Sequence, residues 1–151
     1  FAVGNGNQDV SVTNNLTAGG NITAYSSDRR LKKNFKNLES AVEKISKLNG
    51  CNFDWVDNIE ELGFTPDFPQ NDVGLIAQEV EAVLPQAVAP APFDYECNVY
   101  AKDPEDRKYK SKSGENYLTV RYERLVPLLV EAIKEQQKQI DERKAKMEHN
   151  S

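Results

Sequence analysis

Ser26-Ser27-Asp28-Arg29-Arg30-Leu31-Lys32-Lys33 is the sharpest break in this chain of 151 residues. Upstream of it lies a segment rich in Gly, Asn and Thr with almost no charge. Downstream lies a charged chain whose patterning is mostly helical. The break therefore separates a β-like piece from the part of the sequence that can build a mixed helix and strand domain.

The serines and cations of this octapeptide form a candidate catalytic site. A serine hydroxyl near pH 7 is a poor nucleophile and needs a base to take its proton. A lysine amine is a base only in its neutral form, which burial or cationic neighbours favour. Lys32 lies five positions after Ser27, and the other three cations of the octapeptide are such neighbours. The residues indicate a Ser-Lys pair that cuts the chain at its own junction, but a solvated basic turn with Ser27 or Asp28 capping the next helix fits them as well.

The composition is globular but polar. The chain has 19 Lys and Arg against 24 Asp and Glu, which gives a net charge of −5. We expect no nucleic-acid surface, because phosphate binding needs a basic face, and no membrane or secretory segment, because the apolar runs are too short. With 38% hydrophobic residues the core is thin, which favours a protein that buries more surface on assembly. A chain that begins Phe-Ala-Val without Met is expected to be cut from a longer protein.

Cofactor, metal and general hydrolase chemistry find little support in the sequence. Cys51 and Cys97 lack the spacing of a metal site and could pair only if the fold brings them together, so we interpret both as reduced packing residues. No Gly-rich phosphate loop indicates a nucleotide. The one histidine, His149, lies in a charged tail, and no Gly-x-Ser-x-Gly occurs, so a general serine hydrolase is not favoured.

Residues 1–25 predict short strands and turns. Residues 10–12 alternate, and the segments 16–18 and 21–24 are separated by Gly19-Gly20, which is the spacing of hairpins or stacked turns. Such a piece cannot bury a core by itself. It is typical of the end of a longer β-rich shaft whose sides are covered by other copies of the same strand.

The next part of the chain predicts a helix, a strand and a loop. Apolar residues at helical spacing predict a helix over 38–48, and Asn49-Gly50 is a good stop for it. Residues 51–55 alternate as a strand, and a Pro- and Gly-containing loop follows over 57–71. The apolar stripe of the helix consists of Leu38, Ala41, Val42, Ile45 and Leu48.

Residues 73–85 begin extended and become a helix, which Pro85 ends. The long segment 86–116 predicts a hairpin or lid, because a loop of that length without structure would be unusual in a compact domain. A strand follows over 117–120. The buried stripe of the helix is predicted at Ile76, Val80, Val83 and Leu84.

The last element is a helix from about Tyr122 to the C-terminus. Its start is apolar nearly all round, which predicts deep burial, and Pro127 should sit in its first turn or bend it. A heptad seam continues along it, with Met147 at a core position and polar Gln136 and Arg143 at the alternate one. A fraying charged helix and a parallel coiled coil that joins copies of the chain both fit this pattern. The seam residues are Val126, Leu129, Ile133 and Ile140.

Three motifs in this order resemble one known family. They are Ser-Asp-Arg-Arg-Leu-Lys at 27–32, Val-Gly-Leu-Ile-Ala-Gln-Glu-Val at 73–80 and Arg-Leu-Val-Pro-Leu-Leu-Val-Glu-Ala-Ile-Lys-Glu-Gln at 124–136. Together they resemble the C-terminal intramolecular chaperone domain of phage tailspikes and tail fibres, the self-cleaving endosialidase-type chaperone family. The chain looks most like the end of a long phage tail fibre, such as the L-shaped fibre of a T5-like phage.

The resemblance implies an α+β fold with a short β-rich fibre end, a mixed helix and strand domain and a long C-terminal helix. Three copies would form an intertwined homotrimer with a coiled-coil seam. Residues 1–26 would be the end of the fibre shaft, and residues 27–151 the chaperone that aligns three chains and is then removed. The shaft part would stay in the virion, where its upstream portion meets a host surface receptor, and the chaperone would be released in the host cytoplasm.

The resemblance also assigns the site. The family's nucleophilic serine corresponds to Ser27 and its lysine to Lys32, with Asp28 and Arg30 completing the motif. Cleavage would then fall between Ser26 and Ser27. A non-cleaving trimeric cap with a receptor-binding tip is the alternative.

Overall fold

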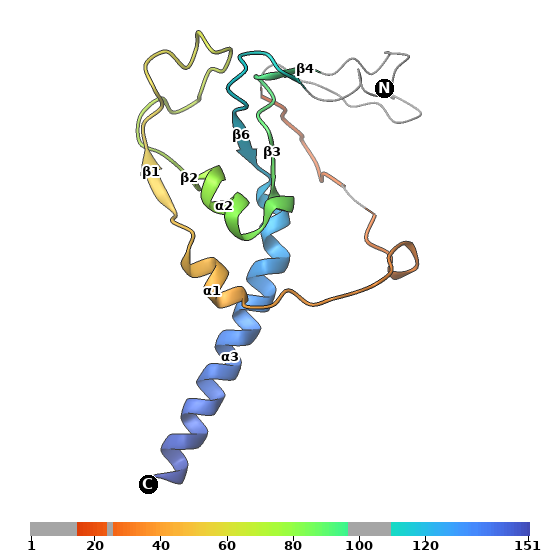
Figure 1. The fold of residues 1–151 in the computed structure, drawn as a ribbon, viewed down its shortest axis with the longest axis vertical. Coiled ribbons are helices and arrows are strands. Elements are labelled where there is room, and N and C mark those ends of the chain that lie inside the picture. Colours follow the sequence, from red (N-terminus) through yellow and green to blue (C-terminus); the bar gives the residue numbers. More distant parts are fainter. Residues whose placement is uncertain (1–14, 24–25, 97–109) are drawn as a thin grey trace. The chain divides into compact units, whose positions relative to one another are not determined.

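The computed structural model describes residues 15–23, 26–96 and 110–151. Short helices and short strands, the strands in consecutive groups, lead to one long C-terminal helix (Figure 1), which confirms the α+β class. The strands pair two by two, β1 with β2, β3 with β6 and β4 with β5. The elements are η1 (Arg29–Leu31), α1 (Ala41–Ser46), β1 (Cys51–Phe53), β2 (Asp72–Gly74), α2 (Ala77–Val83), η2 (Pro85–Ala87), β3 (Val88–Pro90), β4 (Tyr95–Glu96), β5 (Lys110–Ser111), β6 (Leu118–Val120), η4 (Tyr122–Leu125) and α3 (Val126–His149).

The chain forms two compact units, each gathered from three separate stretches. The first unit comprises residues 1–23, 52–74 and 89–119, and the second unit comprises 24–51, 75–88 and 120–151. Both units draw on residues from either side of the Ser26-Ser27 bond. The predicted division into a fibre end (1–26) and a chaperone (27–151) is a functional one, and it stays a prediction.

The core of the second unit is built from α1, α2 and α3 with the short turns next to them. The stripe predicted for the first helix packs here: Ala41 is fully buried, and the partly buried Leu38 and Leu48 lie just beyond the helix ends. The helix itself is shorter than predicted, because Ser40 adopts a left-handed conformation (φ 53°) that a right-handed helix cannot contain. The buried core residues are Ala41, Val80, Leu84, Ala87, Leu125, Leu128 and Ala132.

The stripe predicted for the second helix is right except at its first position. Val80 and Leu84 are buried and Val83 packs against them. Ile76 is 45% exposed, contrary to the prediction. It is the extended residue before α2, so its side chain does not follow the helical period.

The long helix α3 is buried on one side only. Pro127 lies in its first turn, as predicted. Because a proline ring disrupts the hydrogen bond to the preceding turn, the four residues before α3 form a 3-10 turn. The expected deep burial all round is wrong for a single copy: Leu125 and Leu128 are buried, but the seam residue Ile133 is 65% exposed. One face of α3 meets α1 and the core, and the seam face is covered by nothing in the described residues.

The first unit is held by a row of aromatic rings. Neighbouring ring centroids along the row lie 5.1, 5.0, 6.2 and 5.6 Å apart, which is the range for favourable aromatic pairs. Ile59, Ala91 and Asp94 are buried in the same unit. The row runs through Phe53, Trp55, Phe64, Phe93 and Tyr117.

The segment 86–116 contains the predicted hairpin. Strand β4 pairs with β5 in antiparallel register, with Tyr95 opposite Ser111 and Glu96 opposite Lys110. The connection over 97–109, which includes Cys97, lies outside the described residues. Pairing of the two cysteines therefore stays untested.

Residues 15–23 form neither strand nor helix, contrary to the strands predicted over 16–18 and 21–24. A strand needs a hydrogen-bonded neighbour, and the prediction placed that neighbour in other copies of the chain. The alternating residues 10–12 lie outside the described residues. The β-rich shaft therefore stays a prediction.

Asp94 organises the base of the hairpin from a buried position. Its carboxylate accepts hydrogen bonds from the Ser111 hydroxyl at 2.7 Å and from the backbone N–H groups of Ser113 and Tyr117 at 3.0 and 3.1 Å. Burial by itself raises the pKa of this carboxyl, but the hydrogen bonds from Ser113, Ser111 and Tyr117 together lower it to about 2. The ionised form of Asp94 is thus the form that the fold selects.

We expect Asp94→Asn to destabilise the first unit and to remove part of its acid sensitivity. Because the folded pKa of about 2 lies below the ordinary value of 3.8, the carboxylate stabilises the fold above about pH 4, and this contribution is lost as the pH falls toward 2. At pH 7 the variant should lose on the order of 5 °C in Tm. Its further loss between pH 4 and pH 2 should be smaller than that of the wild type.

The fluorescence of Trp55, the single tryptophan, reports this transition from within the aromatic row. Asp57→Asn, which removes an exposed carboxylate of the same unit, is the matched control. Equal acid sensitivity of wild type and Asp94→Asn would contradict the assignment.

Candidate functional site

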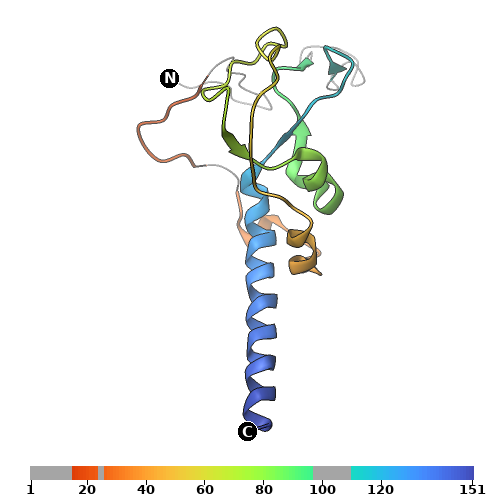
Figure 2. The same ribbon diagram turned by 90° about the vertical axis from the view of Figure 1, so that its left-hand side faces the viewer.

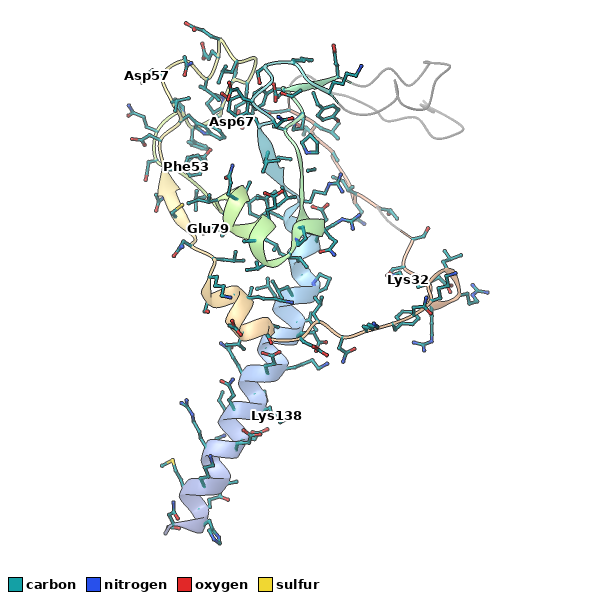
Figure 3. All side chains as sticks on the ribbon, in the orientation of Figure 1. Lys32, Phe53, Asp57, Asp67, Glu79 and Lys138 are labelled. Carbon is teal, nitrogen blue, oxygen red and sulfur yellow. The ribbon has the colours of Figure 1, made fainter. Side chains whose placement is uncertain are left out.

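The octapeptide lies on an exposed arm that precedes α1. Every residue from 26 to 37, here named the arm, is exposed. Figure 3 shows Lys32 on this arm, apart from the helices of the second unit. The arm therefore owes its conformation to contacts within itself.

Asp28 and Arg30 set the turn at the centre of the arm. The Asp28 carboxylate accepts the backbone N–H of Arg30 at 2.8 Å and so caps η1. It also accepts Nε and Nη2 of the same arginine at 3.0 and 2.8 Å, in the two-pronged geometry that suits guanidinium and carboxylate. This side-chain hydrogen bond lowers the pKa of Asp28 and raises that of Arg30. The capping role that the solvated-turn interpretation gave to Ser27 or Asp28 thus falls to Asp28.

The turn brings Ser27 and Lys32 together. The Lys32 Nζ donates a hydrogen bond to the Ser27 Oγ at 2.6 Å. Backbone hydrogen bonds from Leu31 to Asp28 and from Lys32 to Arg29, at 3.0 and 3.2 Å, hold the turn between them. A separation of five residues therefore becomes contact distance through local structure alone.

The Ser27–Lys32 contact has the distance expected of a nucleophile and its base, but the pair lacks the buried surroundings that favour a neutral lysine. The heavy atom of a general base must lie about 2.6–3.2 Å from the heavy atom whose proton it removes, and Lys32 Nζ and Ser27 Oγ meet that condition at 2.6 Å. Both side chains are exposed, and in this hydrogen bond the Lys32 Nζ is the donor and the Ser27 Oγ is the acceptor. General-base catalysis requires the opposite direction, with the amine accepting the hydroxyl proton.

Two apolar side chains stand uncovered beside the pair. Leu31 is 70% exposed and Phe35 is 56% exposed. The Arg29 guanidinium lies over the Phe35 ring at 4.7 Å from its centroid, which closes the arm into a small loop. The arm thus presents two large apolar side chains to water, at sequence positions within four residues of Lys32.

The predicted seam residues form a second exposed surface. Val126, Leu129, Ile133 and Ile140 are 55%, 46%, 65% and 46% exposed. All residues from 136 to 151 are exposed, and Figure 2 shows the C-terminal turns of α3 standing beyond α1. Large aliphatic side chains in this number are unusual on a surface that stays in water.

The sequence did not reveal the role of Glu135. Its carboxylate accepts the backbone N–H groups of Ala41 and Val42 at 2.8 and 2.9 Å and so caps the start of α1 from another helix. The hydrogen bond from Val42, followed by that from Ala41, lowers the pKa of Glu135. Ser40 occupies the usual capping position, but its side chain makes no capping hydrogen bond. No local pattern in the sequence indicates this cap, because the capping residue is 94 positions from Ala41.

Within the described ranges, no group of three or more His, Cys, Asp or Glu side chains is placed to hold a metal ion. Nor is any helix there long and apolar enough to span a bilayer.

Comparison with known proteins identifies the domain. Residues 27–89 match the family described as "Chaperone of endosialidase". This part of the chain belongs to that family, which confirms the recognition made from the three motifs.

The relatives are long tail fibre proteins. The chain is 34% identical over 121 residues to long tail fiber protein Gp37 of Enterobacteria phage K3 and to that of Enterobacteria phage T2. It is 46% identical over 66 residues to that of Salmonella phage S16. These matches cover 80%, 80% and 42% of this chain but only 8%, 7% and 8% of the relatives. The chain thus spans less than a tenth of each of these three relatives, and the narrower resemblance to an L-shaped fibre stays a prediction.

Asp28→Ala should loosen the turn that pairs the two side chains, because it removes both the cap of η1 and the partner of Arg30. Asp28→Asn keeps an oxygen that can cap and loses only the charge, so it should hold the turn more closely. We expect faster amide exchange at Arg30, by roughly tenfold, in Asp28→Ala and a smaller change in Asp28→Asn. Nuclear magnetic resonance of the arm measures this. Identical exchange in wild type and Asp28→Ala would show that another contact holds the turn.

Proposed function

We propose that residues 27–151 are an intramolecular chaperone that trimerises a phage tail fibre and is then released by cleavage of the Ser26-Ser27 bond. The observation that carries the proposal is the 2.6 Å contact between Lys32 and Ser27. The match to the chaperone family begins at Ser27, the first residue after the proposed scissile bond. The names of the relatives support a place at the end of a tail fibre.

The chemistry is an acyl transfer followed by hydrolysis. The Ser27 Oγ attacks the carbonyl carbon of Ser26 while the neutral Lys32 amine takes the hydroxyl proton. A C–O bond forms, the C–N bond breaks, and the leaving Ser27 nitrogen receives a proton, so an ester replaces the amide. Water then hydrolyses the ester to give a carboxylate on Ser26 and a free amine and hydroxyl on Ser27. Attack from a neighbouring chain would use the same bonds.

A single-turnover catalyst of this kind needs no substrate pocket. The scissile bond belongs to the same residue as the nucleophile, so it is held at high effective concentration. Such a catalyst does need control, because cutting before the shaft has folded would remove the chaperone too early. The exposed arm supplies the inactive state: in water the ammonium keeps its proton, and removal of that water favours the neutral amine.

Assembly of three copies would supply the active state. Val126, Leu129, Ile133 and Ile140 recur at heptad spacing and lie exposed in one copy, as expected of a coiled-coil seam before its partners are added. The exposed turns of α3 after Gln136 have no covering segment in the described residues, and a short isolated helix is marginal in water. Three α3 helices would bury this seam, and the same assembly would cover the arm with its exposed Leu31 and Phe35.

Trimerisation explains why a fibre needs this domain. Pairing between three β-rich chains is slow and prone to error, because it depends on contacts that are distant in sequence. A helical trimer at one end fixes the number and register of the chains and raises their local concentration. In this proposal residues 1–26 stay with the shaft in the virion, the upstream part meets a host receptor, and residues 27–151 leave in the host cytoplasm.

One observation favours a second function. Lys32 is solvated in the single copy, and a trimer that leaves it so would not cut. The chain would then be a permanent trimeric cap with a receptor-binding tip. The two functions differ in whether the purified protein shows one chain or two fragments.

We expect the wild type to separate into two fragments on denaturing electrophoresis and the variants Ser27→Ala and Lys32→Ala to stay whole. Loss of the nucleophile removes the acyl acceptor, and loss of the base should slow cleavage by roughly 10²- to 10⁴-fold. Lys36→Ala, which removes an exposed cation of the arm outside the octapeptide and keeps both reacting groups, is the control and should cut. An intact wild-type trimer after long incubation would favour the permanent cap.

Ile133→Asp should keep the chain monomeric and uncut, because it places a charge in the centre of the seam. Lys138→Asp changes an exposed position on the same helix (Figure 3), outside the seam, and should leave both assembly and cleavage intact. Analytical ultracentrifugation gives the oligomeric state, and electrophoresis gives cleavage. A monomeric Ile133→Asp protein that still cuts at the wild-type rate would break the proposed link between assembly and cleavage.

A further inference from the structure

We infer that Glu135 is a positioning residue that couples assembly of α3 to cleavage, by fixing the end of the arm to the assembling helix. The inference rests on the proposed self-cleavage and adds the residue through which assembly reaches the arm.

The contact between Glu135 and α1 is specific and two-pronged. Each carboxylate oxygen accepts one backbone N–H, from Ala41 at 2.8 Å and from Val42 at 2.9 Å. These N–H groups have no acceptor within their own helix, and the Ser40 side chain does not cap them. The carboxylate also places negative charge at the positive end of the α1 dipole. The start of α1 therefore depends on a residue of α3.

Glu135 lies on a different face of α3 from the seam. Leu128, Ala132 and Glu135 follow one another at intervals of four and three and so share a face, on which the first two are buried in the core with α1. Ile133 and Ile140, on either side of Glu135 in sequence, are exposed seam residues. The same helix thus presents the seam on one face and, on another face, the carboxylate that caps α1.

Few residues separate the capped start of α1 from the Ser27–Lys32 pair. Only residues 33–40 separate Lys32 from the start of α1, and of these Leu38 alone packs against the core. With six residues, α1 is too short to hold its first turn without help. Without Glu135 that turn would fray, and the arm would leave the second unit from a position that assembly no longer fixes.

Loss of Glu135 should therefore affect cleavage but not assembly. The seam stays intact without Glu135, so trimers still form, but the end of each arm is no longer held in one position relative to the surface that covers it. Cleavage depends on that position, because small displacements of reacting groups lower rates steeply. Glu135 itself touches neither Ser27 nor the scissile bond.

The test compares Glu135→Ala, Glu135→Gln and Glu142→Ala in the full chain. Glu142 is one heptad further along α3, at the same heptad position and exposed, so it is a matched control. Trimers are isolated by size-exclusion chromatography under conditions that slow cleavage, and their cutting is then followed by electrophoresis. Hydrogen exchange at Ala41 and Val42 monitors the cap.

We expect cleavage per trimer to fall on the order of 10- to 100-fold in Glu135→Ala. Glu135→Gln keeps one strong acceptor oxygen, so its rate should be intermediate, whereas Glu142→Ala should match the wild type. Amide exchange at Ala41 and Val42 should rise in the same order as cleavage falls. A residue that served folding alone would lower the yield of trimer without changing the rate per trimer.

Glu135→Ala trimers that cut at the wild-type rate would overturn the inference and leave the proposed function standing. A wild type that never cuts would overturn the proposed function and this inference together. If Glu135→Ala forms no trimer, the Glu135→Gln trimers decide, with a slowed rate in favour and a wild-type rate against. Loss of trimer in both variants would assign Glu135 to folding and also overturn the coupling.

Discussion

The packing of α3 against α1 and the core is the interaction on which the second unit depends. Leu128 is fully buried and Ala132 nearly so, and burial of one such leucine contributes about 2–3 kcal/mol. The described core has few other large side chains, so this contact is a large part of what holds the unit together. It also decides what remains exposed, because a helix that buries one face must present the others to water or to partners.

One-sided burial gives α3 two faces with different surroundings. The core face ends in a carboxylate that holds α1, and the seam face consists of aliphatic residues in water. A globular protein that worked as a single copy would have little reason to keep Ile133 and Ile140 exposed on the same helix. The polar composition fits this picture, since surface that a single chain cannot bury is available for burial between copies.

The arm follows the opposite principle, because its geometry is local. Asp28 caps the turn, Arg30 pairs with it, and Arg29 lies over Phe35, so the Ser27–Lys32 contact needs no core. Local contacts set the distance between the two atoms. They do not set the solvation of Lys32, which decides whether the amine can act as a base. The geometry of the pair and its solvation are thus determined at two different levels, the arm and its surroundings.

The sequence by itself determined the features that depend on short spacing. It predicted the stripe of α1, the extended start and helix around α2, Pro127 in the first turn of α3, and the pair Ser27 and Lys32, whose atoms prove to be 2.6 Å apart. Each of these follows from the local period of the chain or from a turn of a few residues. The family could be recognised from three short motifs for the same reason.

Only the tertiary structure decided the rest. The ends of α1, the exposure of Ile76, the one-sided burial of α3 and the cap that Glu135 provides all depend on which distant segments meet. The capping partners are 94 residues apart, and a hydrogen bond across that distance leaves no periodic signal in the sequence. The helical period placed the start of this helix at Leu38, whereas in the structure α1 begins at Ala41 and the carboxylate of Glu135 caps it. A chain records its short-range order in residue spacing, whereas contacts between remote segments exist only once the core has formed.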